Sequence, residues 1–122
     1  MATLMSSFLG IHAQLKVFHW QTSSYAKHNA YGATYDTLTD LIDEFMEVHM
    51  GKYGRTALEG KDDAILLSNI GEVNPDEFLE TITAFLLSFN NKLNSQQDSD
   101  LLNIRDEMLG AINKLKYLLT LK

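Results

Sequence analysis

Apolar residues recur with the period of an α-helix along most of the chain, and almost no stretch alternates as a β-strand does. Four amphipathic segments stand out, at about 3–22, 27–53, 75–93 and 99–119. Each segment spaces its large apolar side chains three or four positions apart, which puts them on one face of a helix. The pattern predicts an all-α protein whose four helices bury these faces against one another.

The ends of the predicted helices carry recognisable capping residues. Thr3 is a candidate N-cap for the first helix, and Asn74 followed by Pro75 marks the start of the third. Ser95 and Ser99 are alternative caps for the last helix. These signals fix where the helices begin more firmly than periodicity alone does.

The loop lengths suggest how the helices are connected. A short turn joins the first two helices, so these should lie antiparallel, whereas residues 54–73 form a longer connector. Within that connector, the stretch from Asp63 to Ser68 favours a short helix before Gly71. We therefore predict an up-down-up-down four-helix bundle with a short helix in the middle connector, forming a single domain over residues 1–122.

Composition narrows the classes of partner and metal site. The formal net charge is -6 and the ten Lys and Arg residues are scattered, which argues against DNA binding through a basic tail and against binding to an anionic membrane. No apolar run approaches the roughly 20 residues of a membrane span, and the start lacks the features of a signal peptide, so we expect a location in the cytosol. Cysteine is absent, so any metal must be bound by His and carboxylate groups.

An acidic stripe runs along the second predicted helix. At about 100° per residue, four carboxylates fall within roughly a 60° sector; they are Asp36, Asp40, Asp43 and Glu47. The apolar residues of the same helix centre on the opposite side, so the acids should point away from the core of their own bundle. This direction disfavours a di-iron centre inside one bundle. Two interpretations remain: a solvated face, or half of a metal site completed by another subunit.

Histidines lie on the neighbouring helix surfaces. His12 and His19 share one direction on the first helix, in a largely apolar setting, and His49 lies on the apolar side of the second. Neutral imidazole is a common ligand of first-row metals, and a set of His and carboxylate ligands suits iron better than a closed structural zinc site. For His12 taken alone, a half-buried histidine that makes a hydrogen bond is the simpler interpretation, and His49 is expected in the core or at its edge.

One combination of these residues resembles a known family. The first helix ends in His19-Trp20, His28 opens the second helix, Tyr35 follows seven residues later, and Asp43 and Glu47 form an Asp-x-x-x-Glu pair. The order and spacing resemble the ferroxidase motif of Dps, the mini-ferritins, and in particular the abbreviated Dps-like proteins encoded by some bacteriophages.

The resemblance implies a di-iron site at a two-fold subunit interface. His19 and His28 would be ligands from one subunit, and Asp43 and Glu47 would come from its mate, with Glu47 the bridging carboxylate. Where the family has an acid four residues after the second His, this chain has Gly32, and Asp36 is the candidate substitute. The implied activity is oxidation of Fe(II) by peroxide or oxygen in the cytosol of a bacterium or of a phage-infected host. The implied assembly is a homo-oligomer, at least a two-fold dimer, with a dodecamer needed for storage of Fe(III).

Two other functions are compatible with the sequence. In the first, the protein would be an inactive ferritin-like module, virus-encoded, that serves a structural or interaction role. In the second, it would be a scaffold in which His19 and Asp43 only form a hydrogen bond between subunits. The size of the oligomer and the turnover of the site stay open at this point.

Overall fold

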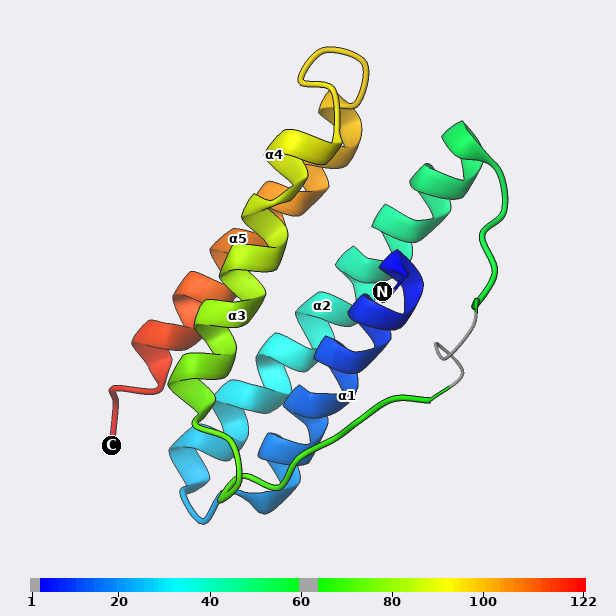
Figure 1. The fold of residues 1–122 in the computed structure, drawn as a ribbon. Helices are drawn as coiled ribbons and strands as arrows, with labels where there is room; N and C mark the ends of the chain where they lie inside the picture. Colours follow the sequence, from blue (N-terminus) through cyan, green and yellow to red (C-terminus); the bar gives the residue numbers. More distant parts are fainter. Residues whose placement is uncertain (1–2, 60–63) are drawn as a thin grey trace.

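The computed structural model describes residues 3–59 and 64–122. These residues form helices and contain no β-strand, which confirms the predicted all-α class (Figure 1). The helices are α1 (Leu4–Gln21), α2 (Tyr25–Tyr53), α3 (Pro75–Leu87), the single turn α4 (Phe89–Lys92) and α5 (Ser99–Leu118). Within the described ranges no helix is both long enough and apolar enough to cross a membrane.

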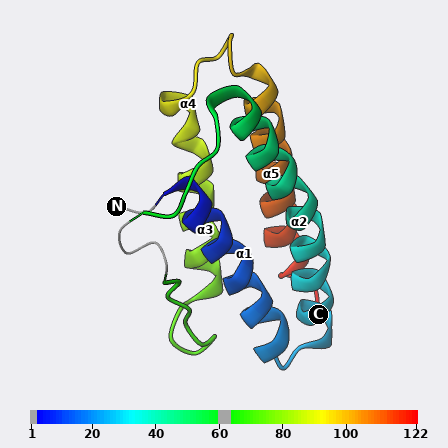
Figure 2. The same ribbon diagram turned by 90° about the vertical axis from the view of Figure 1, so that its right-hand side faces the viewer.

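The path of the chain differs from the predicted up-down-up-down order. α1 and α2 are antiparallel, but the connector after α2 returns along the length of the bundle, so that α3 starts at the same end as α2 (Figures 1 and 2). α2 and α3 therefore run in the same direction, and α5 runs back beside both. The prediction failed because helical periodicity defines the faces of helices and carries no information on the direction of a long connector.

The prediction of a short helix over residues 63–68 is also wrong for the residues of this range that the structure describes. Residues 64–69 are not helical, and Asp63 lies outside the described residues. The physical reason is that side chains of α1 satisfy the connector backbone: Gln14 both accepts from the N–H of Ser68 and donates to its carbonyl, each at 2.9 Å. Gln21 accepts from the N–H of Ile70 at 2.8 Å. These bonds replace those of a helix and hold the connector against α1.

An aromatic cluster centred on Phe8 forms part of the core between α1, α2 and the α3–α4 region. The Phe8 ring packs edge-on against three others, with centroid distances of 5.3 to 6.1 Å, and these are Phe45, Phe85 and Phe89. Leucine, isoleucine and methionine residues of α3 and α5 complete the buried core. Edge-to-face packing of this kind adds about 0.5–1.5 kcal/mol per pair beyond area burial.

Side-chain caps and one buried arginine fix the ends of the helices. Thr3 and Asn74 cap α1 and α3 as predicted, and Ser24 caps α2. The predicted caps Ser95 and Ser99 are wrong, because Asp98 occupies the N-cap position of α5. Arg105 is 6% exposed and donates to the carbonyl of Leu86 and the side chain of Asn90, which ties the junction of α3 and α4 to α5.

Candidate functional site

The turn between α1 and α2 brings two of the predicted ligands together. His19 lies in the last turn of α1 and His28 in the first turn of α2, and their rings stack with centroids 3.9 Å apart. The Nδ1 atom of His19 lies 2.7 Å from the carbonyl oxygen of His28, and Nδ1 of His28 lies 2.8 Å from the carbonyl oxygen of His19. The two residues thus form a reciprocal pair, which we call the histidine pair.

These hydrogen bonds determine which ring nitrogen is free. A carbonyl oxygen can only accept, so each Nδ1 must carry its proton, and in the neutral ring Nε2 keeps its lone pair. Metal-binding histidines commonly donate their other ring N–H to a carbonyl in this way, which fixes the tautomer and the ring orientation. Carbonyl oxygens thus hold both rings of the histidine pair through Nδ1, as they commonly hold the rings of metal-binding histidines.

The stacking indicates how many ions the pair could bind. An ion bound to an imidazole lies close to the plane of the ring, about 2.0–2.2 Å from the nitrogen. The two ring planes are inclined by 17° with centroids 3.9 Å apart, so a single ion cannot lie in both planes. For both imidazoles to bind metal, each ring would need an ion of its own.

Gly32 makes room for this arrangement. A β-carbon added at residue 32 would lie 2.8 Å from Cε1 and 3.0 Å from Nδ1 of His19, closer than real contacts allow. An acidic residue at this position would therefore displace the His19 ring from its stacked position. Gly32, at the position where the resemblance implies an acid, therefore has a steric reason in this fold.

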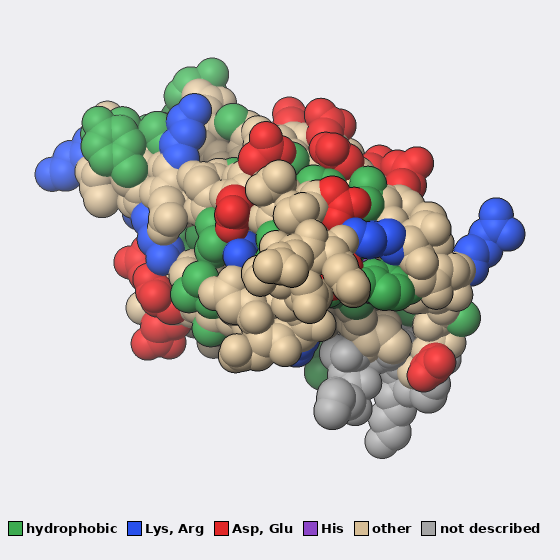
Figure 3. All heavy atoms as spheres, turned by 90° about the horizontal axis from the view of Figure 1, so that it is seen from above, with side chains coloured by type: hydrophobic (Ala, Val, Ile, Leu, Met, Phe, Trp, Pro, Cys, Tyr) green, Lys and Arg blue, Asp and Glu red, His purple; other side chains and the backbone are tan. Residues whose placement is uncertain are grey.

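The acidic stripe lies on the outside of α2, as predicted. Asp36, Asp40, Asp43 and Glu47 are all exposed, and several acidic side chains gather along one edge of the molecule in the view from above (Figure 3). At 1.5 Å per residue, Asp43 and Glu47 lie about 22 Å and 28 Å along α2 from His28. The described residues of one chain contain no cluster of three His, Asp or Glu side chains suited to a metal. The predicted ligands thus form two separate groups, the histidine pair and the acidic stripe.

Asp36 does not join the histidine pair within one chain. It is exposed and lies eight residues beyond His28, about 12 Å along the helix. Among the described residues no group of three His, Asp or Glu side chains suited to a metal contains both of them. The expectation that Asp36 replaces the missing acid is therefore not supported within a single subunit.

A second aromatic stack lies beside the stripe and was only partly predicted. The His12 ring stacks on Tyr35 at 3.8 Å, and its Nε2 lies 2.7 Å from Oγ1 of Thr39 and 3.3 Å from the carbonyl oxygen of Tyr35. This confirms the interpretation of His12 as a half-buried histidine with a hydrogen bond. Burial lowers the pKa of His12 below its ordinary value of 6.5, although the backbone bond and the nearby Asp43 act in the opposite direction.

The Lys16 ammonium group completes this stack. It lies 4.3 Å from the ring centroid of Tyr35 and 5.6 Å from that of Trp20. Because the His12 ring covers one face of Tyr35, the ammonium group lies over the other face. Trp20 itself is 69% exposed. The spacing of His12, Lys16 and Trp20 at four-residue intervals is a signal that could have revealed this stack from the sequence.

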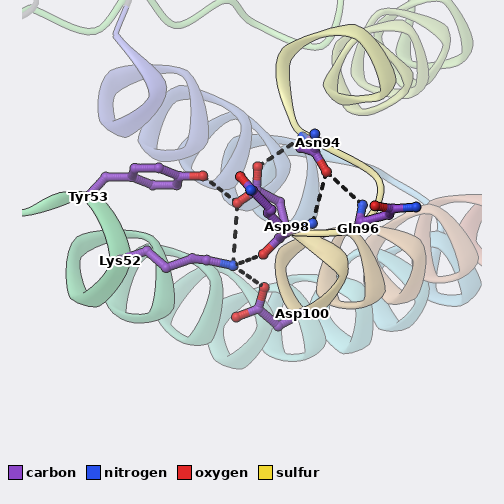
Figure 4. Close-up of polar contacts among 7 residues, drawn as sticks. Lys52, Tyr53, Asn94, Gln96, Asp98 and Asp100 are labelled. Atoms are coloured by element: carbon purple, nitrogen blue, oxygen red, sulfur yellow. Dashed lines mark hydrogen bonds and ion pairs between the residues drawn. The ribbon is translucent and has the colours of Figure 1, made fainter.

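Sequence reasoning also missed a polar cluster at the far end of α2. Tyr53 donates to the carboxylate of Asp98, and Lys52 donates to the carbonyl of Gln97 and pairs with Asp100 at 2.8 Å (Figure 4). Asp98 is 3% exposed and also accepts from the N–H of Asn94 at 2.9 Å. The hydrogen bond from Tyr53 is the main reason that the pKa of Asp98 is lowered. No sequence signal links residues this far apart, and the cluster joins α2 to the turn before α5.

Comparison with known proteins gives two matches. Residues 19–119 match a family described as a family of unknown function (DUF5856). A protein of Enterobacteria phage T4, named "Uncharacterized 14.6 kDa protein in mobD-ri intergenic region", is 31% identical over 104 residues, which cover 85% of this chain and 75% of the phage protein. No solved structure matches the chain.

Proposed function

The chain belongs to the family of unknown function DUF5856, and we propose that it is a Dps-like, ferritin-like protein that binds ferrous iron at a two-fold interface and oxidises it. The histidine pair carries this proposal. It presents two imidazoles whose Nδ1 atoms are held by carbonyl oxygens and whose Nε2 atoms are free to bind metal. The proposed carboxylate ligands, Asp43 and Glu47, are exposed and thus accessible to a second chain.

A two-fold axis can bring the two groups together. Two antiparallel copies of α2 that meet near residues 36–37 would place His28 of each copy level with residues 43–47 of the other. An isologous contact of this kind creates two identical sites, each with imidazoles from one chain and carboxylates from its mate. Exposed aromatic side chains beside the histidine pair support an interface in this region, since Trp20 is 69% and Tyr25 is 79% exposed.

The path of the chain also supports a ferritin-like topology. Ferritin-like folds differ from simple up-down-up-down bundles by one long crossover connection. In this chain, α2 and α3 run in the same direction, and the described parts of the connector between them, residues 54–59 and 64–74, are not helical (Figure 1). The correction to the predicted helix order therefore favours the proposed superfamily.

The proposed chemistry is the oxidation of iron as substrate. Peroxide accepts two electrons, one from each of two ferrous ions, and imidazole and carboxylate ligands are suited to iron in both oxidation states. The acidic stripe would raise the local concentration of cations. Trp20, which directly follows His19 in the chain, would donate electrons to stray oxidants. Storage of ferric iron would need a closed shell, for which the family resemblance implies a dodecamer. The likeness to a phage T4 protein supports a role in the cytosol of an infected host.

A complementation experiment tests whether the site is shared between chains. His28→Gln and Asp43→Asn are each expected to lack the ferric absorbance that the wild type gives after anaerobic Fe(II) loading and addition of peroxide. After the two variants are unfolded together and refolded, half of a random mixture of dimers carries one intact site, so about a quarter of the wild-type signal should return. Glu44→Gln, on the same helix but off the stripe, is the matched control and should oxidise iron normally. No recovery in the mixture, although both variants dimerise, would exclude the shared site.

A structural or interaction module is the second candidate function. The observation that favours it is Gly32, which stands where the Dps family carries a carboxylate. In addition, the two rings of the histidine pair are already held by hydrogen bonds. In that case the wild type forms the same dimer, as measured by its mass in solution, and Fe(II) changes neither its stability nor its absorbance.

A further inference from the structure

A cavity of about 500 Å³ lies at the end of the bundle opposite to the histidine pair. Its lining comes from the start of α1, the second half of α2 and the region from the end of α3 to Leu93. Phe45 and Phe89 contribute buried rings, and Phe85 contributes a half-buried one. Cavities of about 300–1,000 Å³ with mainly apolar walls and a few polar groups are typical of sites for small molecules.

His49 is one of the polar residues in the wall of this cavity, together with Ser7 and Lys92. Its ring lies 6.3 Å from that of Phe45 and 5.1 Å from that of Tyr53. Its Nδ1 atom is buried and has no hydrogen-bond partner among the described residues. Buried polar atoms without a partner are rare, because such an atom loses its hydrogen bond to water and gains nothing in return. Because Nδ1 is buried, it is shielded from the cavity as well as from solvent, and His49 contributes to the wall through the other atoms of its ring.

Lys92 provides a positive charge at the same cavity. Its ammonium group lies 5.9 Å from the ring centroid of Phe85, and the described residues provide no acidic partner for it. An isolated cation beside an apolar cavity attracts anions and repels cations. With a single positive charge available, a ligand with one negative charge matches better than a polyanion.

We propose that this cavity binds a small apolar monocarboxylate, with its carboxylate at the Lys92 ammonium group and its apolar body on the three phenylalanine rings. An uncharged hydrocarbon would leave the Lys92 ammonium group without an anionic partner, and an amine would face that group with a like charge. A carboxylate matches this position, since its oxygens accept hydrogen bonds from an ammonium group. This site is separate from the proposed iron site and does not depend on it.

Binding can be tested with the metal-free protein and two probes, decanoate for an aliphatic body and 2-naphthoate for an aromatic one. Isothermal titration calorimetry measures affinity, and NMR spectra of the His49 ring report the position of the probe. Ligand that binds only the native state also raises the unfolding temperature as its concentration rises. Decylamine, with the same apolar body as decanoate but the opposite charge, is the control ligand and should bind at least tenfold more weakly.

Three variants separate this site from nonspecific binding. Lys92→Gln should weaken decanoate binding at least fivefold at low salt, whereas Lys114→Gln, an equal change of charge at an exposed position of α5, should not. Ser7→Leu should fill part of the cavity and abolish binding while the protein stays folded. The proposal is overturned if neither probe binds at about 5 mM, or if binding is unchanged in Ser7→Leu and Lys92→Gln.

Discussion

Gly32 faces the imidazole of His19 so closely that a β-carbon at residue 32 would lie 2.8 Å from Cε1. The ring cannot retreat freely, because its Nδ1 donates to the carbonyl of His28 and its face stacks on the His28 ring. We expect Gly32→Ala to lower the free energy of unfolding by about 1–2 kcal/mol, since the lost hydrogen bond and the overlap outweigh the gain of about 1 kcal/mol in helix propensity. Urea denaturation monitored by circular dichroism measures this change.

Two further variants isolate the contribution of the His19 contact. Gly110 lies inside α5 with nothing within 4 Å of an added β-carbon, so Gly110→Ala should stabilise the protein by about 0.5–1 kcal/mol. In a protein that already carries His19→Ala, the substitution Gly32→Ala should likewise become stabilising. If Gly32→Ala stabilises the otherwise unchanged protein, the close packing of the histidine pair is wrong.

The sequence predicted local features well and relations between distant segments poorly. The long helices appeared close to their true limits because apolar periodicity and the caps Thr3 and Asn74 are local signals. The histidine pair was foreseeable because only a short turn separates its members. The direction of the crossover depends on contacts between Gln14 and Ser68, which are 54 residues apart, and no local pattern encodes them. The steric role of Gly32 likewise became visible only when the position of the His19 ring was known.

The contacts of Gln14 with the connector give a second prediction. Gln14→Leu keeps the size of the side chain and removes both hydrogen bonds to Ser68. At about 1 kcal/mol for each bond, the connector should open locally while the helices stay intact. Hydrogen exchange at the Ser68 amide should accelerate by about tenfold or more.

Gln21→Leu is the matched control for this exchange measurement. Gln21 accepts from the amide of Ile70 and makes no bond to Ser68, so its loss should expose the Ile70 amide and leave Ser68 protected. Equal protection of Ser68 in the wild type and Gln14→Leu would contradict the assigned role of Gln14.

The buried carboxylate of Asp98 gives a prediction of pH dependence. The hydrogen bond from Tyr53, the backbone bond from Asn94 and the nearby Lys52 lower the pKa of Asp98 in the folded state below the value of the unfolded chain. Its contribution to stability is therefore present above about pH 4, the unfolded value, and is lost as the pH falls through the lower folded value. The wild-type unfolding temperature should drop through this acidic range.

Asp98→Asn should remove that part of the pH dependence and lower the unfolding temperature at pH 7 by about 3–5 °C. Asp100→Asn is the matched control, because Asp100 pairs with the same Lys52, but its side chain is 53% exposed against 5% for Asp98. Exposed ion pairs contribute little, so this variant should unfold within about 1–2 °C of the wild type at pH 7. Thermal scans at pH 3 and pH 7 compare the two variants. An equal decrease of the unfolding temperature in both would mean that the burial of Asp98 does not contribute to stability.

The proposed two-fold interface predicts an unusual effect of Asp36. If antiparallel copies of α2 meet near residues 36–37, the Asp36 carboxylates of the two chains lie close to each other across the axis. Like charges about 4 Å apart in water repel by about 1 kcal/mol, and salt screens this repulsion. Asp36→Asn should therefore tighten the dimer several-fold at low ionic strength and much less at about 0.5 M salt. Asp40→Asn makes the same chemical change one turn further along the stripe, where no like charge faces it across the axis, and should have a smaller effect. Sedimentation equilibrium measures the dissociation constants of both variants. A dimer weakened by Asp36→Asn, or strengthened equally by Asp40→Asn, would place the two-fold axis elsewhere. The histidine pair of one chain would then not face the Asp43 and Glu47 carboxylates of the other.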